Sequence, residues 1–209
     1  MATSAGLTRA TVSNSPQKGF DFCREKLIRR QSLGLASDPI NAKQIETSSQ
    51  DRTKPMDLSK LLIPGAVRFV GQMPAKKRLF QELGEIAAQA YGLSAAAVVD
   101  GLQERESLGP TGVGHGLALP HARLEEVDRI CGIFLRLERP LNYDSVDRQP
   151  VDLIFALLAP KDSGVEHLKA LALVSRTMRD ASICAKLRAN SDPDKLHAIL
   201  TESRASQAA

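Results

Sequence analysis

The spacing of apolar residues divides the chain near residue 56. Residues 56–209 contain runs with the periodicity of helices and strands, whereas residues 1–55 are rich in Ser, Thr, Asn and Gln, with one short amphipathic stretch at Phe20–Leu33. A segment with few long apolar side chains cannot bury enough surface to offset the entropy lost on ordering. We therefore expect a disordered N-terminal extension over 1–55 and a folded domain over 56–209.

Short runs of β-branched, aromatic and aliphatic residues predict the strands. They cover Ala66–Gly71, Leu117–Leu119, Arg129–Leu137 and Val151–Leu158. The last of these runs is too apolar to face water, so we expect it at the centre of a sheet. Gly109–Gly116 contains four glycines in eight residues and is predicted to be a loop.

Apolar residues three and four positions apart predict helices before and after these strands. The expected helices cover 74–92, 94–106, 166–175, 181–188 and 193–203, with a short lead-in helix over 57–64. Pro74 suits a first helical turn, Ser94 suits an N-cap, and Pro64 is expected to end the lead-in helix. The order of strand, two helices, three strands and three helices favours an α/β fold, in which a mixed sheet carries helices on both faces.

Composition excludes several classes of protein. Hydrophobic residues make up 43% and charged residues 25%, which is typical of a globular chain. The three cysteines, Cys23, Cys131 and Cys184, form no CxxC pair, which argues against a zinc ribbon or a disulfide scaffold and favours a cytoplasmic location. No apolar run approaches the ~18 residues that span a bilayer, so we expect no membrane insertion.

The net charge of +4 comes from the N-terminal extension. Residues 1–55 hold nine Lys or Arg and five Asp or Glu, which leaves 19 basic and 19 acidic residues in 56–209. The basic surplus is therefore no reason to expect nucleic acid as a partner of the domain. The extension lacks the apolar core of a secretion signal and only weakly resembles an organellar transit peptide, so we favour a solvated tail or a true start at Met56.

Among residues that could carry chemistry, His121 is the first candidate. It follows Pro120 at the end of a strand and comes just after the glycine-rich loop, where it could act as nucleophile, acid/base or metal ligand. A purely structural histidine is an equally good interpretation of the spacing alone. His167 at a helix start and Arg105 at a helix end have ordinary explanations as a surface cap and a partner of the helix dipole. A His115–His121–His167 metal site has little support, so no metal is expected.

One longer motif is more specific. Glu106, followed after six residues by Val113-Gly-His-Gly-Leu-Ala-Leu-Pro-His-Ala122, resembles the type-2 IIA signature of the bacterial phosphoenolpyruvate-dependent phosphotransferase system. The resemblance continues through Gln149–Pro160 and Glu166–Ala172, and it covers essentially all of 56–209. Within the family, the chain is most similar to the nitrogen-regulatory branch rather than to the mannitol or fructose transport domains.

The resemblance implies a fold and a site. The family fold is a three-layer α/β/α sandwich, in agreement with the element order. His121 matches the phosphorylated histidine, Arg105 the arginine beside it and His167 the second histidine of the active site. Backbone amides of the glycine-rich loop are expected to bind phosphoryl oxygens together with Arg105; these residues are Gly112, Val113, Gly114, His115 and Gly116. No cofactor is expected.

The family also implies a function. We expect a phosphocarrier that accepts a phosphoryl group on His121 from a phosphohistidine carrier protein and regulates partners such as potassium transporters or sensor kinases. One alternative is a IIA subunit of sugar transport that passes phosphate to a IIB partner. Another, from a different class, is an interaction module in which His121 is not modified.

Overall fold

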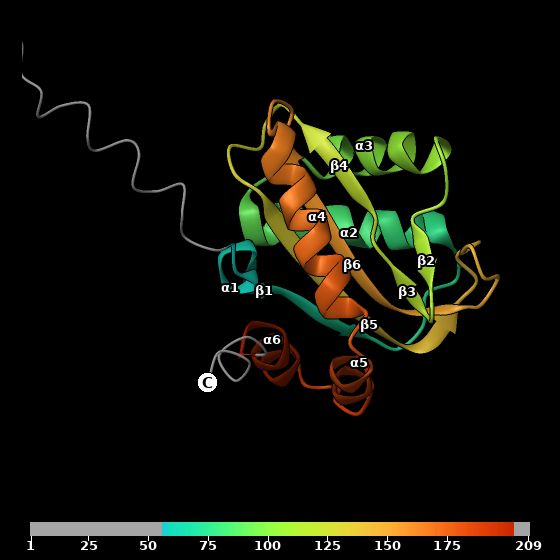
Figure 1. Cartoon of the computed structure of the whole chain (residues 1–209). Helices are drawn as coiled ribbons and strands as arrows, with labels where there is room; N and C mark the ends of the chain where they lie inside the picture. Colours follow the sequence, from blue (N-terminus) through green and yellow to red (C-terminus); the bar gives the residue numbers. More distant parts are fainter. Residues whose placement is uncertain (1–55, 203–209) are drawn as a thin grey trace, which may run out of the picture. The chain divides into compact units, whose positions relative to one another are not determined.

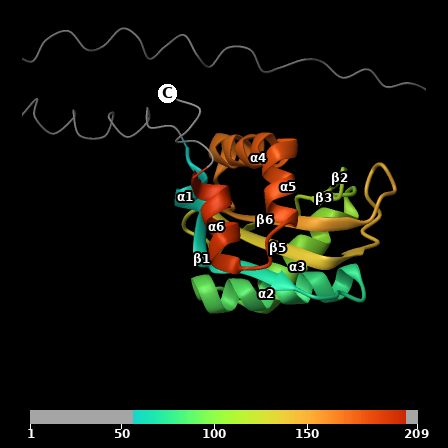
Figure 2. The same cartoon turned by 90° about the horizontal axis from the view of Figure 1, so that it is seen from below.

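The computed structural model of the chain describes residues 56–202. The expectation of a disordered extension over 1–55 lies outside the described residues. Six strands form one mixed sheet, and Figure 2 shows helices α2 and α3 on one face and α4, α5 and α6 on the other. The predicted three-layer α/β/α architecture is therefore confirmed.

The sheet is built around β6, which is buried along almost its whole length. The strand order is β1-β5-β6-β3-β2, and β4 also pairs with β6 (Figure 1). β6 runs antiparallel to β5 and parallel to β3 and β4, and its central position is as predicted. The strands are β1 (Leu62–Val70), β2 (Gly112–Gly114), β3 (Leu117–Ala118), β4 (His121–Leu124), β5 (Cys131–Leu141) and β6 (Val151–Pro160).

The helices follow the predicted ranges closely. They are α1 (Leu58–Leu61), α2 (Lys76–Tyr91), α3 (Ala95–Ser107), α4 (Gly164–Met178), α5 (Ala181–Arg188) and α6 (Pro193–Glu202). Ser94 caps α3 as expected, because its side chain accepts a hydrogen bond from the amide of Ala97. Gly92 ends α2 in the left-handed conformation, with φ of 72°.

The first strand differs from its predicted range. It begins at Leu62, so Pro64 lies inside the strand rather than ending a helix. β1 is an edge strand, and its pairing with β5 shifts register between Leu62 and Val67. A proline is tolerated at such a bulge on an edge, because no ladder hydrogen bond is required of it.

The glycine-rich segment also differs, because it contains a strand. Gly112–Gly114 pairs antiparallel with β3 as a small hairpin. A further strand, β4, follows Pro120 and was not predicted. β3 and β4 continue along β6 in one register, with Leu117 opposite Leu153 and His121 opposite Leu157. Pro120 interrupts this line because it has no N–H to donate to the ladder.

Candidate functional site

Three elements bring the predicted site residues together. Arg105 lies in the last turn of α3, His121 is the first residue of β4, and His167 lies in the first turn of α4. All three line one cleft of about 520 Å³. The rings of His121 and His167 meet edge to face, with centroids 5.5 Å apart. A histidine that was ambiguous in the sequence thus lies beside both of its expected partners.

The hydrogen bonds of His121 define its protonation state. Arg105 Nε–H donates to Nε2 of His121 at 2.9 Å, and Nδ1 lies 2.9 Å from the carbonyl oxygen of Leu119. An arginine Nε is only a donor and a carbonyl is only an acceptor, so the ring proton sits on Nδ1. Nε2 therefore carries the free electron pair and faces the cation of Arg105.

His167 is held in the opposite tautomer. Its Nδ1 accepts a hydrogen bond of 3.0 Å from Nε of Arg123, so the ring proton lies on Nε2. The residue is only 4% exposed, and its Nε2 is buried without a hydrogen-bond partner in the structure. A buried donor without an acceptor is costly. His167 thus lines the cleft with an N–H group that lacks an acceptor.

Both imidazoles are kept neutral near pH 7. Burial lowers the pKa of His121, and the charges of Arg105 and Arg123 lower it further, while the bond to the Leu119 carbonyl and the charge of Glu106 oppose them. Burial, His121 and Arg123 lower the pKa of His167 to about 4. A neutral imidazole retains a nucleophilic nitrogen, and the nearby guanidinium groups favour an anionic ligand.

Arg123 was missed in the sequence, because β4 was not recognised as a strand. It also lines the cleft and lies two residues after His121. Alternate residues of a strand point to the same face, so a strand beginning at His121 would have placed Arg123 beside it. The two-residue spacing of His121 and Arg123 indicates a shared face only once β4 is recognised as a strand.

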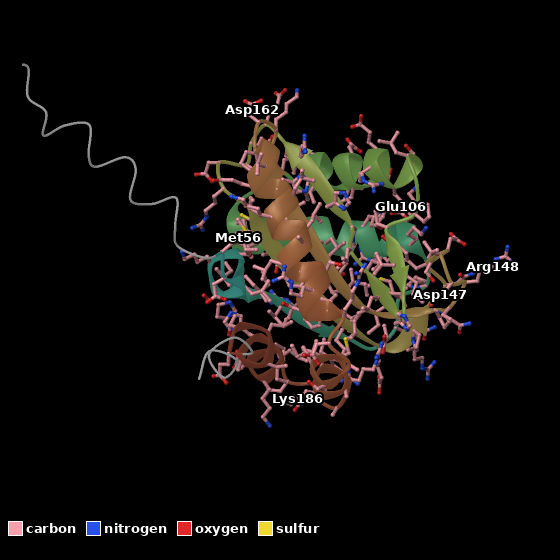
Figure 3. The ribbon with its side chains drawn as sticks, in the orientation of Figure 1. Met56, Glu106, Asp147, Arg148, Asp162 and Lys186 are labelled. Carbon is pink, nitrogen blue, oxygen red and sulfur yellow. The ribbon has the colours of Figure 1, made fainter. Side chains whose placement is uncertain are left out.

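The glycine-rich segment lies elsewhere. Residues 112–116 form β2 and its turn into β3, and none of them is among the residues that line the His121 cleft. The amide of His115 donates to Asp147 at 2.8 Å, and its carbonyl accepts from Arg188 at 2.9 Å. Figure 3 shows Asp147 in the loop beside this hairpin. The structure therefore does not bring Gly112, Val113, Gly114, His115 and Gly116 to His121, contrary to the arrangement expected.

This hairpin instead borders a second cavity of about 830 Å³, opposite α5. Arg188 of α5 bonds Asp152 through two nitrogens, at 2.7 and 2.8 Å, as well as the His115 carbonyl. At Gly116, an added Cβ would lie 2.6 Å from Arg188 and 2.7 Å from Asp152. The glycine is thus explained by this close approach and by its positive φ of 78°.

Within residues 56–202, no group of three His, Cys, Asp or Glu is arranged to hold a metal ion. Over the same residues, no helix has the length and apolar character needed to cross a bilayer.

Comparisons with known proteins agree with the fold. The family model for the phosphoenolpyruvate-dependent sugar phosphotransferase system, EIIA 2, matches residues 60–203. A nitrogen regulatory protein of Bradyrhizobium diazoefficiens is 43% identical over 145 residues, which are 69% of this chain and 95% of that protein. The crystal structure of nitrogen regulatory protein IIA-Ntr from Neisseria meningitidis is 36% identical, with a TM-score of 0.65, and the match covers 69% of this chain and 99% of that one. The IIA mannitol structure from Escherichia coli shares the fold at 19% identity and a TM-score of 0.55, over 65% and 96% of the two chains.

Proposed function

The chain belongs to the EIIA type-2 family of the phosphoenolpyruvate-dependent sugar phosphotransferase system, and on this basis we propose that it is a phosphocarrier acting through His121. The donor is the phosphohistidine of a carrier protein. The observation that carries the proposal is the pair of groups beside the His121 ring: the Arg105 guanidinium bonded to its Nε2 and the ring of His167, 5.5 Å away between centroids, whose Nε2–H is unpaired.

The transfer is a direct displacement at phosphorus. The electron pair on Nε2 of His121 forms the new P–N bond, and the P–N bond of the donor breaks with its electron pair returning to the donor imidazole. His121 keeps its proton on Nδ1, where the Leu119 carbonyl accepts it. Phosphoryl transfer passes through a loose transition state, so positioning and charge stabilisation matter more than proton transfer.

Arg105 and His167 have complementary tasks in this step. As the phosphorus approaches Nε2, the guanidinium of Arg105 exchanges its bond to the nitrogen for bonds to phosphoryl oxygens, which it can bind in pairs. The buried Nε2–H of His167 gains an acceptor from the same group. Arg123 fixes the tautomer of His167 that makes this donation possible.

The relatives favour a regulatory role for the carrier. Relatives that are 39–43% identical over about 70% of this chain carry the name nitrogen regulatory protein, while the mannitol structure supports the fold alone. We therefore infer that the phosphorylation state of His121 controls binding to regulatory target proteins, such as potassium transporters or sensor kinases, in preference to onward transfer to a sugar-specific IIB.

A labelling experiment tests the proposal. The full chain is incubated with radiolabelled phosphoenolpyruvate, enzyme I and its phosphohistidine carrier, and acid-labile phosphate on the protein is followed with time. We expect label on the wild type and none on His121→Ala. Equal labelling of the variant would refute the assignment of His121, and fast loss of label to a sugar-specific IIB would favour sugar transport over regulation.

A further inference from the structure

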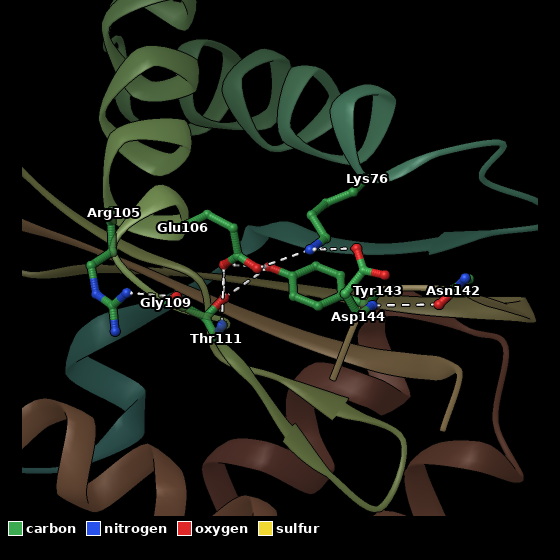
Figure 4. Close-up of polar contacts among 8 residues, drawn as sticks. All are labelled: Lys76, Arg105, Glu106, Gly109, Thr111, Asn142, Tyr143 and Asp144. Carbon is green, nitrogen blue, oxygen red and sulfur yellow. Dashed lines mark hydrogen bonds and ion pairs between the residues drawn. The ribbon is translucent and has the colours of Figure 1, made fainter. Parts of the chain in front are cut away.

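Glu106 is the centre of a polar cluster that the phosphoryl-transfer step does not use. It is the penultimate residue of α3, and its side chain is 11% exposed. Figure 4 shows its carboxylate between Thr111 on one side and Lys76 on the other. One oxygen pairs with Lys76 Nζ at 3.0 Å, and the other accepts from the amide of Thr111 at 3.2 Å and from its hydroxyl.

Buried groups complete this cluster. Thr111 and Tyr143 are 4% and 0% exposed, and their hydroxyls lie 2.9 Å apart. Burial raises the pKa of Tyr143, so its hydroxyl remains a donor toward Glu106. Lys76 lies 4.5 Å from the centre of the Tyr143 ring and also pairs with Asp144 at 3.2 Å. A carboxylate with this many donors holds the parts of the chain around it in fixed positions.

Two routes lead from Glu106 to the two nitrogens of His121. The first is through the neighbouring residue Arg105, which bonds Nε2 of His121 and also donates from Nη1 to the carbonyl of Gly109 at 2.9 Å. In the turn between α3 and β2, Arg105 thus binds Gly109 and Glu106 binds Thr111, as seen in Figure 4.

The second route runs through the backbone on the other side. Glu106 holds the amide of Thr111, and the carbonyl of Thr111 accepts from the amide of Leu119 at 2.9 Å. The carbonyl of Leu119 in turn accepts from Nδ1 of His121 at 2.9 Å. The Glu106 carboxylate is therefore linked to the Leu119 carbonyl, which accepts the ring proton, and through the chain to Arg105, which covers the free electron pair.

We propose that Glu106 is a positioning residue for His121: it sets the tautomer and orientation of the imidazole by fixing Arg105 and the Thr111–Leu119 segment. The proposal rests on the phosphocarrier function for its effect on rate, while the tautomer of His121 can be measured with no phosphoryl donor present. Glu106 itself does not touch the reacting atoms.

The test variant is Glu106→Gln, which keeps the shape of the side chain but removes its charge. The amide group of Gln can accept from Thr111 on one side, but it presents N–H groups to Lys76, so the cluster loosens. In the full chain, we expect the labelling rate from the phosphohistidine carrier to fall roughly ten-fold or more, the effect of small misplacement of reacting groups. We expect nitrogen NMR of His121 to show a smaller population of the Nδ1–H tautomer.

The control is Glu82→Gln, which removes a carboxylate that is 24% exposed and pairs with Arg78 at 3.1 Å on α2. It should leave both the labelling rate and the His121 tautomer as in the wild type. Thr111→Val is a second, isosteric probe that deletes the hydroxyl that donates to Glu106 and pairs with Tyr143, and it should shift both readouts in the same direction by a smaller factor. It decides the question if Glu106→Gln does not fold.

The outcomes separate the two proposals. A wild-type tautomer or a wild-type labelling rate in folded Glu106→Gln overturns the positioning role. If the wild-type protein itself accepts no label, the phosphocarrier function fails and with it the effect of Glu106 on rate. In that case a tautomer shift still shows that Glu106 orients His121.

Discussion

Arg105 donates its Nε–H to Nε2 of His121 at 2.9 Å, so the cation covers the electron pair of the proposed nucleophile. This bond keeps the nitrogen unprotonated and marks the place where a phosphorus atom would arrive. The same guanidinium is anchored through Nη1 to the Gly109 carbonyl. Arg105 can therefore turn from nitrogen to phosphoryl oxygen without leaving the site.

The first prediction concerns Arg105→Lys. Lysine keeps the charge but cannot bind two oxygens in a plane, so we expect phosphoryl transfer to slow by about 100-fold, as for the loss of one transition-state donor. The thermal midpoint should change little. The matched control is Arg78→Lys, because Arg78 pairs with Glu82 and Glu85 on the surface of α2. Equal transfer rates for the two variants would remove Arg105 from the site.

The second prediction concerns pH and His167. The pKa of His167 is about 4 in the folded chain, below the ordinary value of 6.5. The unfolded chain therefore binds more protons between these values, and stability falls as the pH drops from above 6.5 toward 4. The contribution of this one group is on the order of 3 kcal/mol.

Urea unfolding of the wild type and His167→Asn measures this contribution. Other groups also titrate in the window, so the comparison uses the difference in unfolding free energy between the two proteins at each pH. As the pH falls toward 4, we expect the wild type to lose unfolding free energy relative to His167→Asn. Below pH 4 the difference should become constant. A difference that is independent of pH would show that His167 titrates normally.

The third prediction separates the β2–β3 hairpin from the transfer site. Arg188→Gln removes the contacts with Asp152 and the His115 carbonyl. Because the pair is partly exposed, we expect a loss of about 1 kcal/mol or less in stability. The rate of phosphoryl transfer to His121 should not change, since the hairpin does not line the cleft. A rate that falls more than the stability loss explains would restore a phosphate-binding role to residues 112–116.

The fourth prediction concerns the contact between α2 and α3. At Gly84, an added Cβ would lie 2.7 Å from the carbonyl oxygen of Ala95 and 2.9 Å from Cγ2 of Val99. Gly84→Ala should therefore destabilise the fold by about 1–2 kcal/mol, although alanine favours helix elsewhere. Gly65→Ala has open space around it and should be nearly neutral. Calorimetry on both variants checks the contrast.

Much of the fold was predictable from the sequence, because local patterns specify it. The apolar run at Val151–Leu158 placed the central strand, and the caps at Ser94 and Gly92 fixed two helix ends. Pro64 misled the prediction, because a local rule for proline takes no account of whether a strand lies at an edge. The short strand β4 was missed since it depends on pairing with the distant strand β6, and β2 was missed because its glycine-rich sequence favours a loop.

The sequence predicted three of the residues that line the cleft but missed Arg123 and did not predict the geometry. His121, Arg105 and His167 follow from the motif, yet the tautomers follow only from the positions of Leu119 and Arg123. The glycine-rich segment precedes His121 closely in the chain, and the sequence offered no means of seeing that the hairpin turns toward α5. Residues that are close in the chain need not be close in space when a hairpin lies between them, because its turn can lie several residues' length from the strand that follows.

The shared register of β3 and β4 along β6 limits how chain length can vary in natural sequences with this fold. Leu117 lies opposite Leu153 and His121 opposite Leu157, with the same offset on either side of Pro120. One deleted residue at Leu119–Pro120 would turn His121 to the opposite face of the sheet and leave Ala122 in its place, and one inserted residue would also turn His121 away. Insertions and deletions are therefore not expected in this two-residue link.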